Sequence, residues 1–222
     1  MNLPTTSAYR LLIIGANGGV GRQCVEIALE AGHHVKALVR NPANLPITHH
    51  NLQIVKGDIT QPGTLLPYLR DTDAVISAIG VKGGFGGDRP TTLYSQGAKN
   101  ILQEMKATGA QRVFFISASA IEISPVIPFV VRLAAKYIVQ RLLRHMYDDL
   151  RRMETIVKES DADWTIIRPP RLTNRPATGH YRFVINSFLK NCLQIGRADL
   201  AHFMIHHIND EATHKSTIEI AK

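Results

Sequence analysis

Residues 10–21 read Arg-Leu-Leu-Ile-Ile-Gly-Ala-Asn-Gly-Gly-Val-Gly, and this stretch decides the fold of the chain. Its apolar run predicts a buried strand that ends at Gly15, and the apolar positions after it have helical spacing. A strand that turns through glycines onto a helix presents backbone N–H groups and the positive end of the helix dipole to an anion. The stretch therefore predicts a phosphate site where that helix begins.

Three glycines at three-residue spacing, Gly15, Gly18 and Gly21, define the turn. Gly15 allows the tight turn, and Gly21 permits close packing of the helix on the strand. Gly18 or Gly19 lets the backbone approach a pyrophosphate. This spacing is typical of short-chain and extended dehydrogenases, and the alternative is an ordinary glycine-rich turn that holds no ligand.

The second strand of the pattern, 34–40, ends at Arg40, which lies 19 residues beyond Gly21. In dinucleotide-binding folds an acidic residue near this position binds the ribose 2′-hydroxyl. A guanidinium instead suits a 2′-phosphate, which it can bind through two charge-assisted hydrogen bonds. Arg40 therefore favours NADP(H) over NAD(H), and the alternative is a solvated surface arginine.

The 222 residues, 45% hydrophobic and 20% charged, suit one globular α/β domain. The formal net charge of +8 fits an anionic ligand such as NADP(H), and no zinc-finger or RNA-binding motif accompanies it, so we expect no nucleic-acid partner. His202 and His206 have helical i, i+4 spacing but lack a third ligand, so we expect no metal site. With no secretion signal, no long apolar run and two cysteines that we expect to be reduced, we expect a cytoplasmic protein.

Apolar strands alternate with amphipathic helices along the chain, which predicts a Rossmann-type, doubly wound parallel sheet in a single domain, 1–222. We expect strands at 10–15, 34–40, 52–56, 73–79, 111–117 and 163–168. We expect helices at 18–31, 61–70, 91–109 and within 128–160. Residues 169–222 are expected to form the substrate side, with a last helix and strand.

Ligands of such sheets bind beyond the carboxyl ends of the strands, which selects the residues that follow each expected strand. Asp58 is a candidate acceptor for the adenine amino group and Ile59 a candidate packing surface for the ring; the alternative for Asp58 is a turn or N-cap role. Small residues at 78–80 leave room for the central part of a dinucleotide. The nicotinamide is expected near Ser117, Pro169, Pro170 and Arg171.

Nearly the whole chain resembles the atypical short-chain dehydrogenase/reductase group of NAD(P)-binding, NmrA-like proteins, and within it biliverdin-IXβ/flavin reductase. The similar segments include Gly15-Ala-Asn-Gly-Gly-Val-Gly21, Leu38-Val-Arg40, Val55-Lys-Gly-Asp58, Gly97-Ala-Lys-Asn-Ile101, Arg168-Pro-Pro170, Pro176-Ala-Thr-Gly179-His-Tyr181 and Asp199-Leu-Ala-His-Phe-Met204. The glycine motif is shared by many dehydrogenases, whereas the ordered set is more specific. The resemblance implies a single-domain Rossmann-type fold, NADP(H) binding and hydride transfer to a flavin or tetrapyrrole-like acceptor.

The resemblance also implies which residues contact the cofactor: Gly15, Asn17, Gly18, Gly19, Val20, Arg40, Asp58, Ile59, Ala78, Ile79 and Gly80. Ser117, Pro169 and Pro170 would border the nicotinamide. The reductase has a serine where this chain has Ala118, and histidines where it has Leu150 and Arg171. The alternatives for that serine are Ser117, Ser119 or no serine at all, and Arg171 is a candidate site for an acidic acceptor. Ser117 and Arg171 are therefore the candidate catalytic residues.

Three further features have two interpretations each. The loop 81–87, with four glycines, is a candidate lid. The basic, apolar segment 124–147 is either a packed helix or a peripheral membrane or partner contact. Tyr147 and Arg151 have the spacing of the Tyr-x-x-x-Lys pair of ordinary short-chain dehydrogenases, although a helix-surface contact explains that spacing as well.

The sequence therefore predicts an NADPH-dependent reductase of a flavin, a tetrapyrrole-like compound or another conjugated acceptor, working as a monomer or small homo-oligomer. Such acceptors take hydride at a ring position and draw their proton from solvent, so positioning carries most of the catalysis. The alternative is a non-catalytic NADP(H)-sensing or assembly protein of the NmrA-like type.

Overall fold

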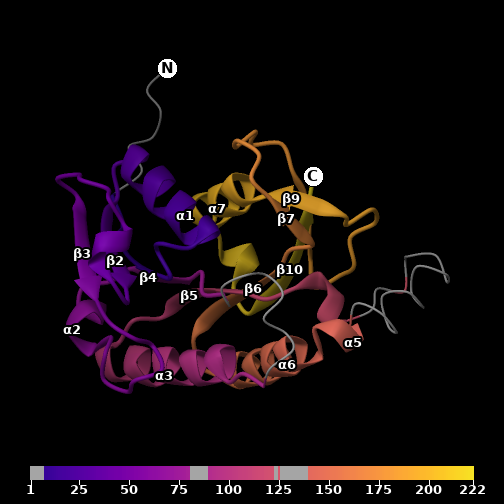
Figure 1. The fold of residues 1–222 in the computed structure, drawn as a ribbon, viewed down its shortest axis with the longest axis horizontal. Helices are drawn as coiled ribbons and strands as arrows, with labels where there is room; N and C mark the ends of the chain where they lie inside the picture. The colour runs from indigo at the N-terminus through magenta and orange to yellow at the C-terminus, as the bar shows by residue number, and fades with distance from the viewer. Residues whose placement is uncertain (1–7, 81–89, 123–124, 126–139) are drawn as a thin grey trace.

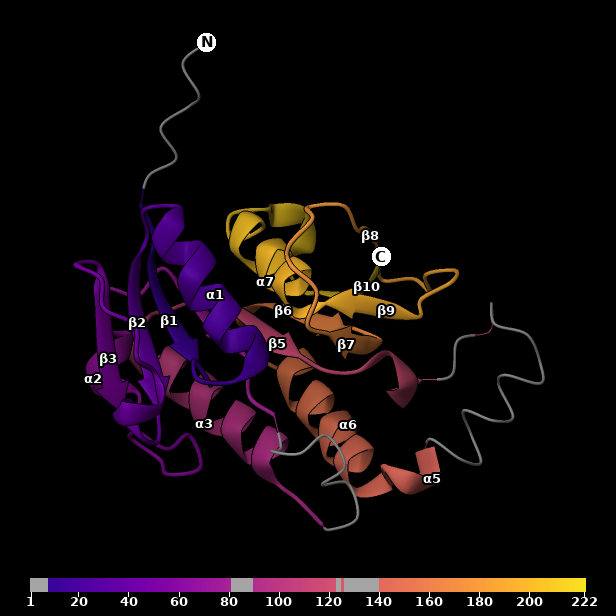
Figure 2. The same cartoon turned by 45° about the horizontal axis from the view of Figure 1, so that its top comes forward.

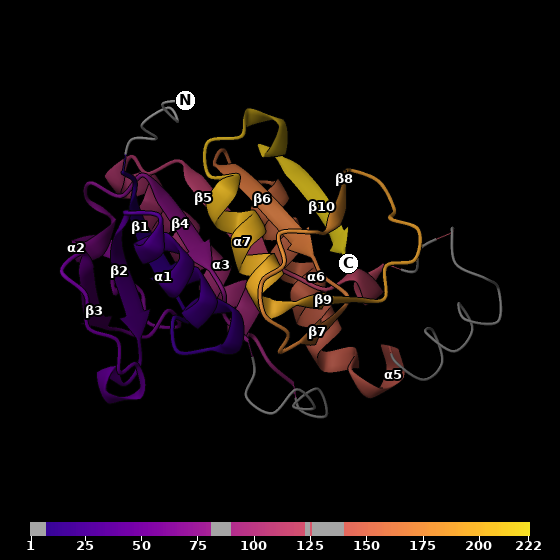
Figure 3. The ribbon, with the colours of Figure 1, turned by 90° about the horizontal axis from the view of Figure 1, so that it is seen from above.

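The structure, a computed structural model, describes residues 8–80, 90–122, 125 and 140–222. An eight-stranded sheet has the spatial order β3-β2-β1-β4-β5-β6-β10-β8 (Figure 3). Its strands are β1 (Arg10–Ile14), β2 (His34–Val39), β3 (Leu52–Lys56), β4 (Ala74–Ser77), β5 (Arg112–Ile116), β6 (Asp163–Arg168), β8 (Arg182–Ile185) and β10 (Ser216–Ala221). All neighbours are parallel except β10 and β8, so the predicted doubly wound sheet is confirmed.

Helices cover both faces of this sheet (Figures 1 and 2). Helices α1 (Gly19–Glu30) and α7 (Arg197–His206) pack together on one face. Helices α2 (Leu66–Leu69), α3 (Leu93–Thr108) and α6 (Arg144–Lys158) pack on the other, with a short α5 (Gln140–Leu142) before α6. Each face carries one continuous hydrophobic core, because the strands are apolar on both sides, as parallel strands between helix layers must be.

The carboxyl ends of β1, β2 and β4 are aligned with one another by the pairing register of these strands. Ile14, the last residue of β1, lies opposite Leu38 of β2 and opposite Ser77 of β4. The residues that follow these strands therefore share one edge of the sheet. This edge is where the chain passes from β1 into α1 and where the predicted cofactor residues cluster.

The predicted helix over 61–70 is wrong in its first half, since α2 covers only Leu66–Leu69. Gly63 has φ +83°, a left-handed conformation that interrupts a helix. The buried carboxylate of Glu104 accepts hydrogen bonds from the backbone amides of Gly63 at 2.9 Å and Leu65 at 2.7 Å. A distant side chain therefore satisfies these amides, and helical hydrogen bonds are not needed there.

The C-terminal part contains the expected last helix and strand, α7 and β10, and three strands that the sequence did not predict. Two of these, β7 (Arg171–Thr173) and β9 (Gln194–Gly196), form a separate parallel pair, and the third, β8, is the antiparallel edge of the main sheet. The loop 81–87 and residues 126–139 of the basic segment lie outside the described residues. None of the described helices has the length and apolar character needed to cross a bilayer.

We expect Gly21→Ala to destabilise the fold and Gly80→Ala to leave it nearly unchanged. A Cβ on Gly21 would lie 2.2 Å from the carbonyl oxygen of Gly15, so helix or turn must shift, whereas a Cβ on Gly80 meets nothing within 4 Å. Urea unfolding should show a loss of about 2 kcal/mol for Gly21→Ala and a change within about 0.5 kcal/mol for Gly80→Ala. Equal stability of both variants would contradict the close approach.

Candidate functional site

A cavity of about 370 Å³ lies beyond the carboxyl ends of β1, β2, β3 and β4. Nine of the predicted cofactor residues line it: Gly15, Asn17, Gly18, Arg40, Asp58, Ile59, Ala78, Ile79 and Gly80. Six further residues complete the wall: Ile14, Leu38, Val39, Gly57, Thr60 and Leu93. The structure therefore brings together residues from four strand ends into a single mixed polar and apolar cavity, which is the usual form of a ligand site.

The glycine turn forms one end of this cavity. Gly15 has φ +78°, and its carbonyl accepts a hydrogen bond of 2.9 Å from the amide of Gly18. The first helical bond of α1 runs from the Arg22 amide to the Gly18 carbonyl, so the amides of Gly19 and Val20 precede the helical ladder. These two amides and the helix dipole supply the donors and the positive potential that a pyrophosphate requires.

The turn packs closely on its own backbone and on the end of β4, which favours glycine at two positions. A Cβ on Gly15 would lie 2.7 Å from the carbonyl oxygen of Ala78, and one on Gly18 would lie 3.1 Å from the carbonyl oxygen of Gly15. The first turn of α1 contains no acidic side chain that would repel the phosphate. The residues present therefore fit a dinucleotide.

The other end of the cavity holds Arg40 and Asp58. Arg40 is exposed at the end of β2, where its guanidinium is accessible to a ligand. One oxygen of Asp58 accepts hydrogen bonds from the amide of Thr60 at 2.9 Å and from its hydroxyl at 2.8 Å, so Asp58 is a turn residue as well as a cavity residue. The Thr60 bonds, with a smaller contribution from the charge of Arg40, hold the pKa of Asp58 below its ordinary value.

Ile59 forms a rigid apolar wall because α3 holds it. A Cβ on Gly97 would lie 2.4 Å from Cδ1 of Ile59, so only glycine lets the helix approach this closely. The side-chain amide of Asn100 donates to the Ile59 carbonyl at 2.7 Å. Ile59 is thus fixed between the strand end and the helix, as a packing surface for a planar ring requires.

The expected nicotinamide-side residues lie at the neighbouring strand ends and do not line this cavity. The Ser117 amide donates to the Ile167 carbonyl at 2.7 Å and the Ser119 amide to the Pro169 carbonyl at 3.0 Å, which joins the ends of β5 and β6. Arg171 is exposed in β7. The structure therefore places these residues next to each other and on the side of the sheet away from Arg40.

The hydroxyl of Ser117 takes part in a buried ionic cluster. It donates to Oε1 of Glu154 at 2.7 Å, and Arg168 donates to both oxygens of Glu154, at 2.9 and 2.6 Å. Arg168 also bonds Glu122 at 2.6 Å, and Lys158 bonds Glu154 at 3.2 Å. The hydroxyl proton is thus directed toward the carboxylate of Glu154.

The positive charges around Glu154 affect its pKa more strongly than its burial does. Burial by itself raises the pKa of Glu154, but hydrogen bonds and charge from Arg168, with smaller contributions from Ser117 and Lys158, lower that pKa below its ordinary 4.5. Glu154 therefore remains an anion at neutral pH. Its role is to hold Ser117 and Arg168, and so the ends of β5 and β6, in place.

The pair Tyr147 and Arg151 does not have the geometry of a catalytic tyrosine with its lysine. Tyr147 is buried, and burial raises its pKa, with only partial compensation from the charge of Arg151. The Arg151 guanidinium bonds Asp148 at 2.9 Å and the Ile121 carbonyl at 2.9 Å. The raised pKa makes Tyr147 a poor proton exchanger near neutral pH.

The two histidines with helical spacing face each other on α7. The rings of His202 and His206 stack at 3.7 Å, and His202 Nδ1 shares a hydrogen bond of 2.9 Å with the Tyr181 hydroxyl. In the described part of the chain, no three histidine, cysteine or acidic side chains converge as metal ligands would.

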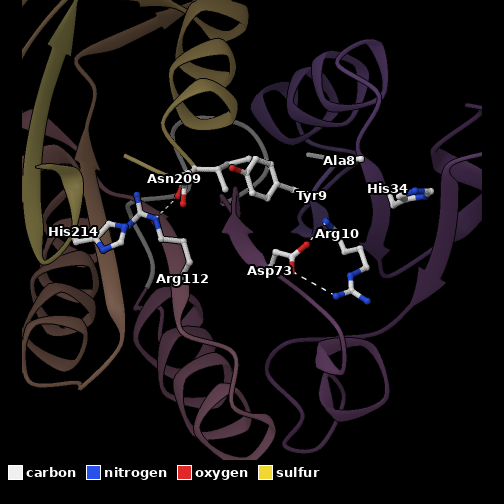
Figure 4. Close-up of a pocket in the computed structure, with 9 residues that line it drawn as sticks. Ala8, Tyr9, Arg10, His34, Asp73, Arg112, Asn209 and His214 are labelled. Atoms are coloured by element: carbon white, nitrogen blue, oxygen red, sulfur yellow. Dashed lines mark hydrogen bonds and ion pairs between the residues drawn. The ribbon is translucent and has the colours of Figure 1, made fainter. Parts of the chain in front are cut away.

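A larger cavity, of about 620 Å³, lies at the opposite edge of the sheet, where β1, β4 and β5 begin (Figure 4). Arg112 on its wall is held by hydrogen bonds to Ile208, Thr165 and Thr213, at 3.0, 2.8 and 2.8 Å. Asp73 accepts from the Arg10 amide at 2.7 Å. These charged groups serve the fold, and ligands of such sheets bind at the other edge, so this cavity is not the candidate site.

Sequence reasoning missed Arg197, the first residue of α7. Its side chain lies against Gly19 and donates a hydrogen bond of 2.6 Å to the Asn174 side chain. No local motif indicates this contact, because the two segments are far apart in the chain and meet only when α7 packs on α1.

We expect Glu154→Gln to lower the free energy of unfolding by about 3 kcal/mol at pH 7, because the buried charge of Arg168 loses its main partner. The folded-state pKa of Glu154 lies below its ordinary 4.5, so its charge stabilises the fold above that pH and the contribution disappears as the pH falls through the lowered pKa. Urea unfolding at several pH values should show a constant wild-type advantage above about pH 5 that shrinks in more acidic buffer. A pH-independent difference would contradict this assignment.

Known proteins with similar sequences include a hydroxysteroid dehydrogenase/isomerase and an assembly factor. An uncharacterized chloroplastic protein of Arabidopsis thaliana is 29% identical over 183 residues, which cover 77% of this chain and 62% of that protein. A 3β-hydroxysteroid dehydrogenase/Δ5→4-isomerase of Mycobacterium tuberculosis is 29% identical over 53% of this chain and 34% of its own length. The photosystem II assembly factor Ycf39 of Cyanophora paradoxa is 32% identical over 48% of this chain and 33% of its own length. The chain thus spans less than two thirds of each of these relatives.

Solved structures share the fold. A short-chain dehydrogenase/reductase of Veillonella parvula in complex with NADP superposes with a TM-score of 0.77 at 18% identity, covering 96% of this chain and 94% of that one. A putative NAD-dependent epimerase/dehydratase of Bacillus halodurans gives 0.75 at 24% identity, covering 97% and 94%. The model of the NAD(P)H-binding family matches residues 15–211, which span the cavity and α7. The predicted Rossmann fold and dinucleotide cofactor are therefore confirmed, and the chain belongs to the NAD(P)H-binding family.

Proposed function

We propose that the chain is an NADPH-dependent reductase that transfers hydride to a flavin, a tetrapyrrole-like compound or another conjugated acceptor. The observation that carries this proposal is the cavity at four strand ends, with Arg40 where NAD-specific sites carry an acidic residue. The resemblance to the biliverdin-IXβ/flavin reductase group supplies the acceptor class. The dehydrogenase among the relatives supports redox chemistry in general.

Each part of the cavity has a role toward the cofactor. The amides at the start of α1 bind the pyrophosphate, Arg40 binds the 2′-phosphate, and Ile59 packs against the adenine. The small residues 78–80 let the central part of the dinucleotide pass over β4. NADPH supplies the hydride when it is bound. The chain contributes orientation and a partly dry environment, which account for most of the catalysis that such a transfer needs.

The acceptor is proposed to lie near Ser117, Pro169, Pro170 and Arg171, with residues 169–222 as its surroundings. Arg171 is exposed in β7 and suits an acidic group of the acceptor, such as a propionate or phosphate. Ser117 and Arg171 are proposed as the candidate catalytic residues through contact with the acceptor; the Ser117 hydroxyl is bonded to Glu154 and is not proposed as the proton donor. That bond favours an acceptor whose proton comes from solvent, which is the property of flavin-like compounds.

A second candidate function is NADP(H) sensing or assembly without turnover. The similarity to an assembly factor supports it, as does the raised pKa of Tyr147, which removes one possible proton donor. The cytoplasmic location, the monomeric or small homo-oligomeric state and a peripheral contact by 124–147 remain predictions. The name of the Arabidopsis relative places that protein in the chloroplast.

Arg40→Ala is expected to weaken NADPH binding by about 1.5–3 kcal/mol, because a charge-assisted contact to the 2′-phosphate is lost. NADH binding should change little, because NADH lacks that phosphate. Isothermal titration calorimetry with both reduced dinucleotides measures the two effects. Arg70→Ala is the matched control, since Arg70 is exposed at the end of α2 and does not line the cavity. An equal loss for NADPH and NADH would contradict the role of Arg40.

Turnover distinguishes the two candidate functions. NADPH oxidation is followed at 340 nm with FMN, riboflavin, biliverdin and quinones as acceptors. A reductase should turn over at least one of them with saturation kinetics, and NADPH should be preferred to NADH. Tight NADPH binding without turnover on this panel would replace the reductase by the sensing or assembly protein.

A further inference from the structure

The side chain of Arg197, at the start of α7, packs directly against Gly19, at the start of α1. A Cβ on Gly19 would be 2.7 Å from Cδ of Arg197 and 2.8 Å from its Nε. The aliphatic stem of Arg197 therefore packs on the backbone of the residue whose amide opens the helix. Only glycine at position 19 permits this contact, so the glycine serves the arginine as well as the turn.

Most hydrogen-bond donors of the Arg197 guanidinium are not used within the described part of the chain. It carries five N–H groups, and within the described part of the chain its one acceptor is the side chain of Asn174, at 2.6 Å. Arg168, by contrast, is buried and bonds two carboxylates, and buried Arg112 bonds five acceptors on neighbouring segments. Arg197 is half-buried and remains able to bind a ligand.

The position of Arg197 is fixed by its surroundings. Helix α7 packs on α1, and Leu200, Ala201 and Met204 of α7 belong to the same core as Cys24 and Ala28 of α1. The buried Asp199, two residues after Arg197, accepts from the amides of Thr178 at 2.6 Å and Gly179 at 3.0 Å. The start of α7 is thus tied both to α1 and to the loop that follows β7, so little freedom is lost when Arg197 binds a ligand.

We propose that Arg197 is a second phosphate-binding cation of the dinucleotide site and binds the phosphate on the nicotinamide side of the pyrophosphate. The proposal rests on the proposed dinucleotide site and assigns it a further residue. Arg40 follows β2, on one side of β1, whereas Arg197 approaches α1 from the half of the sheet that carries β5, β6 and β10. Arg40 thus recognises the phosphate that only NADP(H) has, and Arg197 recognises one that both dinucleotides share.

The physical basis is the charge of the pyrophosphate, which the amides of α1 alone neutralise only in part. A helix N-terminus supplies about half an elementary charge. A guanidinium beside the same amides adds a full charge and paired donors whose geometry matches a phosphate. Because Gly19 and Arg197 touch, the two sources of positive charge converge on one side of the turn.

Two small probes separate the roles of the arginines. ADP-ribose contains the pyrophosphate and lacks the 2′-phosphate, whereas adenosine 2′,5′-bisphosphate contains the 2′-phosphate and lacks the nicotinamide-side phosphate. The variant Arg197→Met keeps the stem on Gly19 and removes the charge. Calorimetry should show ADP-ribose weakened about 10- to 100-fold and adenosine 2′,5′-bisphosphate changed less than about threefold. Arg40→Ala should give the reverse pattern, and Arg197→Lys should recover part of the lost affinity for ADP-ribose.

Thermal unfolding of Arg197→Met checks that the fold is kept, and Arg197→Gln, which also removes the charge, provides the test if the methionine variant unfolds. If a folded variant without the charge binds ADP-ribose as tightly as the wild type, or loses both probes equally, the role of Arg197 is overturned while the dinucleotide site stands. If the wild-type protein binds neither probe nor NADPH, the proposed function fails together with this inference.

Discussion

The approach of α1 to the turn at Gly15 is the constraint on which the rest of the structure depends. A side chain at Gly21 would meet the Gly15 carbonyl at 2.2 Å, and one at Gly15 would meet the Ala78 carbonyl at 2.7 Å. The turn therefore lies within van der Waals contact of both the helix and the end of β4. This packing aims the positive end of α1 over the strand ends and opens the cavity beside them. The glycines serve close contact here, and flexibility is not their function.

The sequence predicts those parts of the fold and site whose signals are local. The strands 52–56 and 163–168 were predicted to the residue because their composition and flanking turns suffice. The glycine spacing, the strand-end rule and the family resemblance selected nine residues that line one cavity at the strand ends. The rest depends on contacts between distant segments: Glu104 binds the backbone amides where the first half of the helix at 61–70 was predicted, and Glu154 accepts the hydrogen bond of the Ser117 hydroxyl. No pattern near any of these residues encodes its partner.

The arginines show why the basic composition alone says little about function. Arg112 and Arg168 are buried, and their donors are used by carbonyls, hydroxyls and carboxylates of the fold. Arg40 and Arg171 are exposed at strand ends, where a ligand can reach them. A net charge of +8 is the same number whether the cations hold strands together or hold phosphates. The hydrogen-bond partners of each guanidinium distinguish arginines that stabilise the fold from arginines that are free to bind a ligand. The composition alone does not make this distinction.

The proton supply decides between the kinds of redox chemistry that this family fold can host. Oxidation or reduction at a carbonyl carbon, as in a hydroxysteroid dehydrogenase, needs a group that exchanges the hydroxyl proton near neutral pH. In the described part of this chain the two side chains nearest to that role are poorly suited, because Ser117 is directed toward Glu154 and burial raises the pKa of Tyr147. A conjugated acceptor does not require a protein side chain as proton donor, because the charge delocalises over its ring and solvent supplies the proton. The same geometry would also suit a protein that binds NADPH without reacting. What separates the two is therefore a surface for a planar acceptor beside the nicotinamide, which we propose at Pro169, Pro170 and the exposed Arg171.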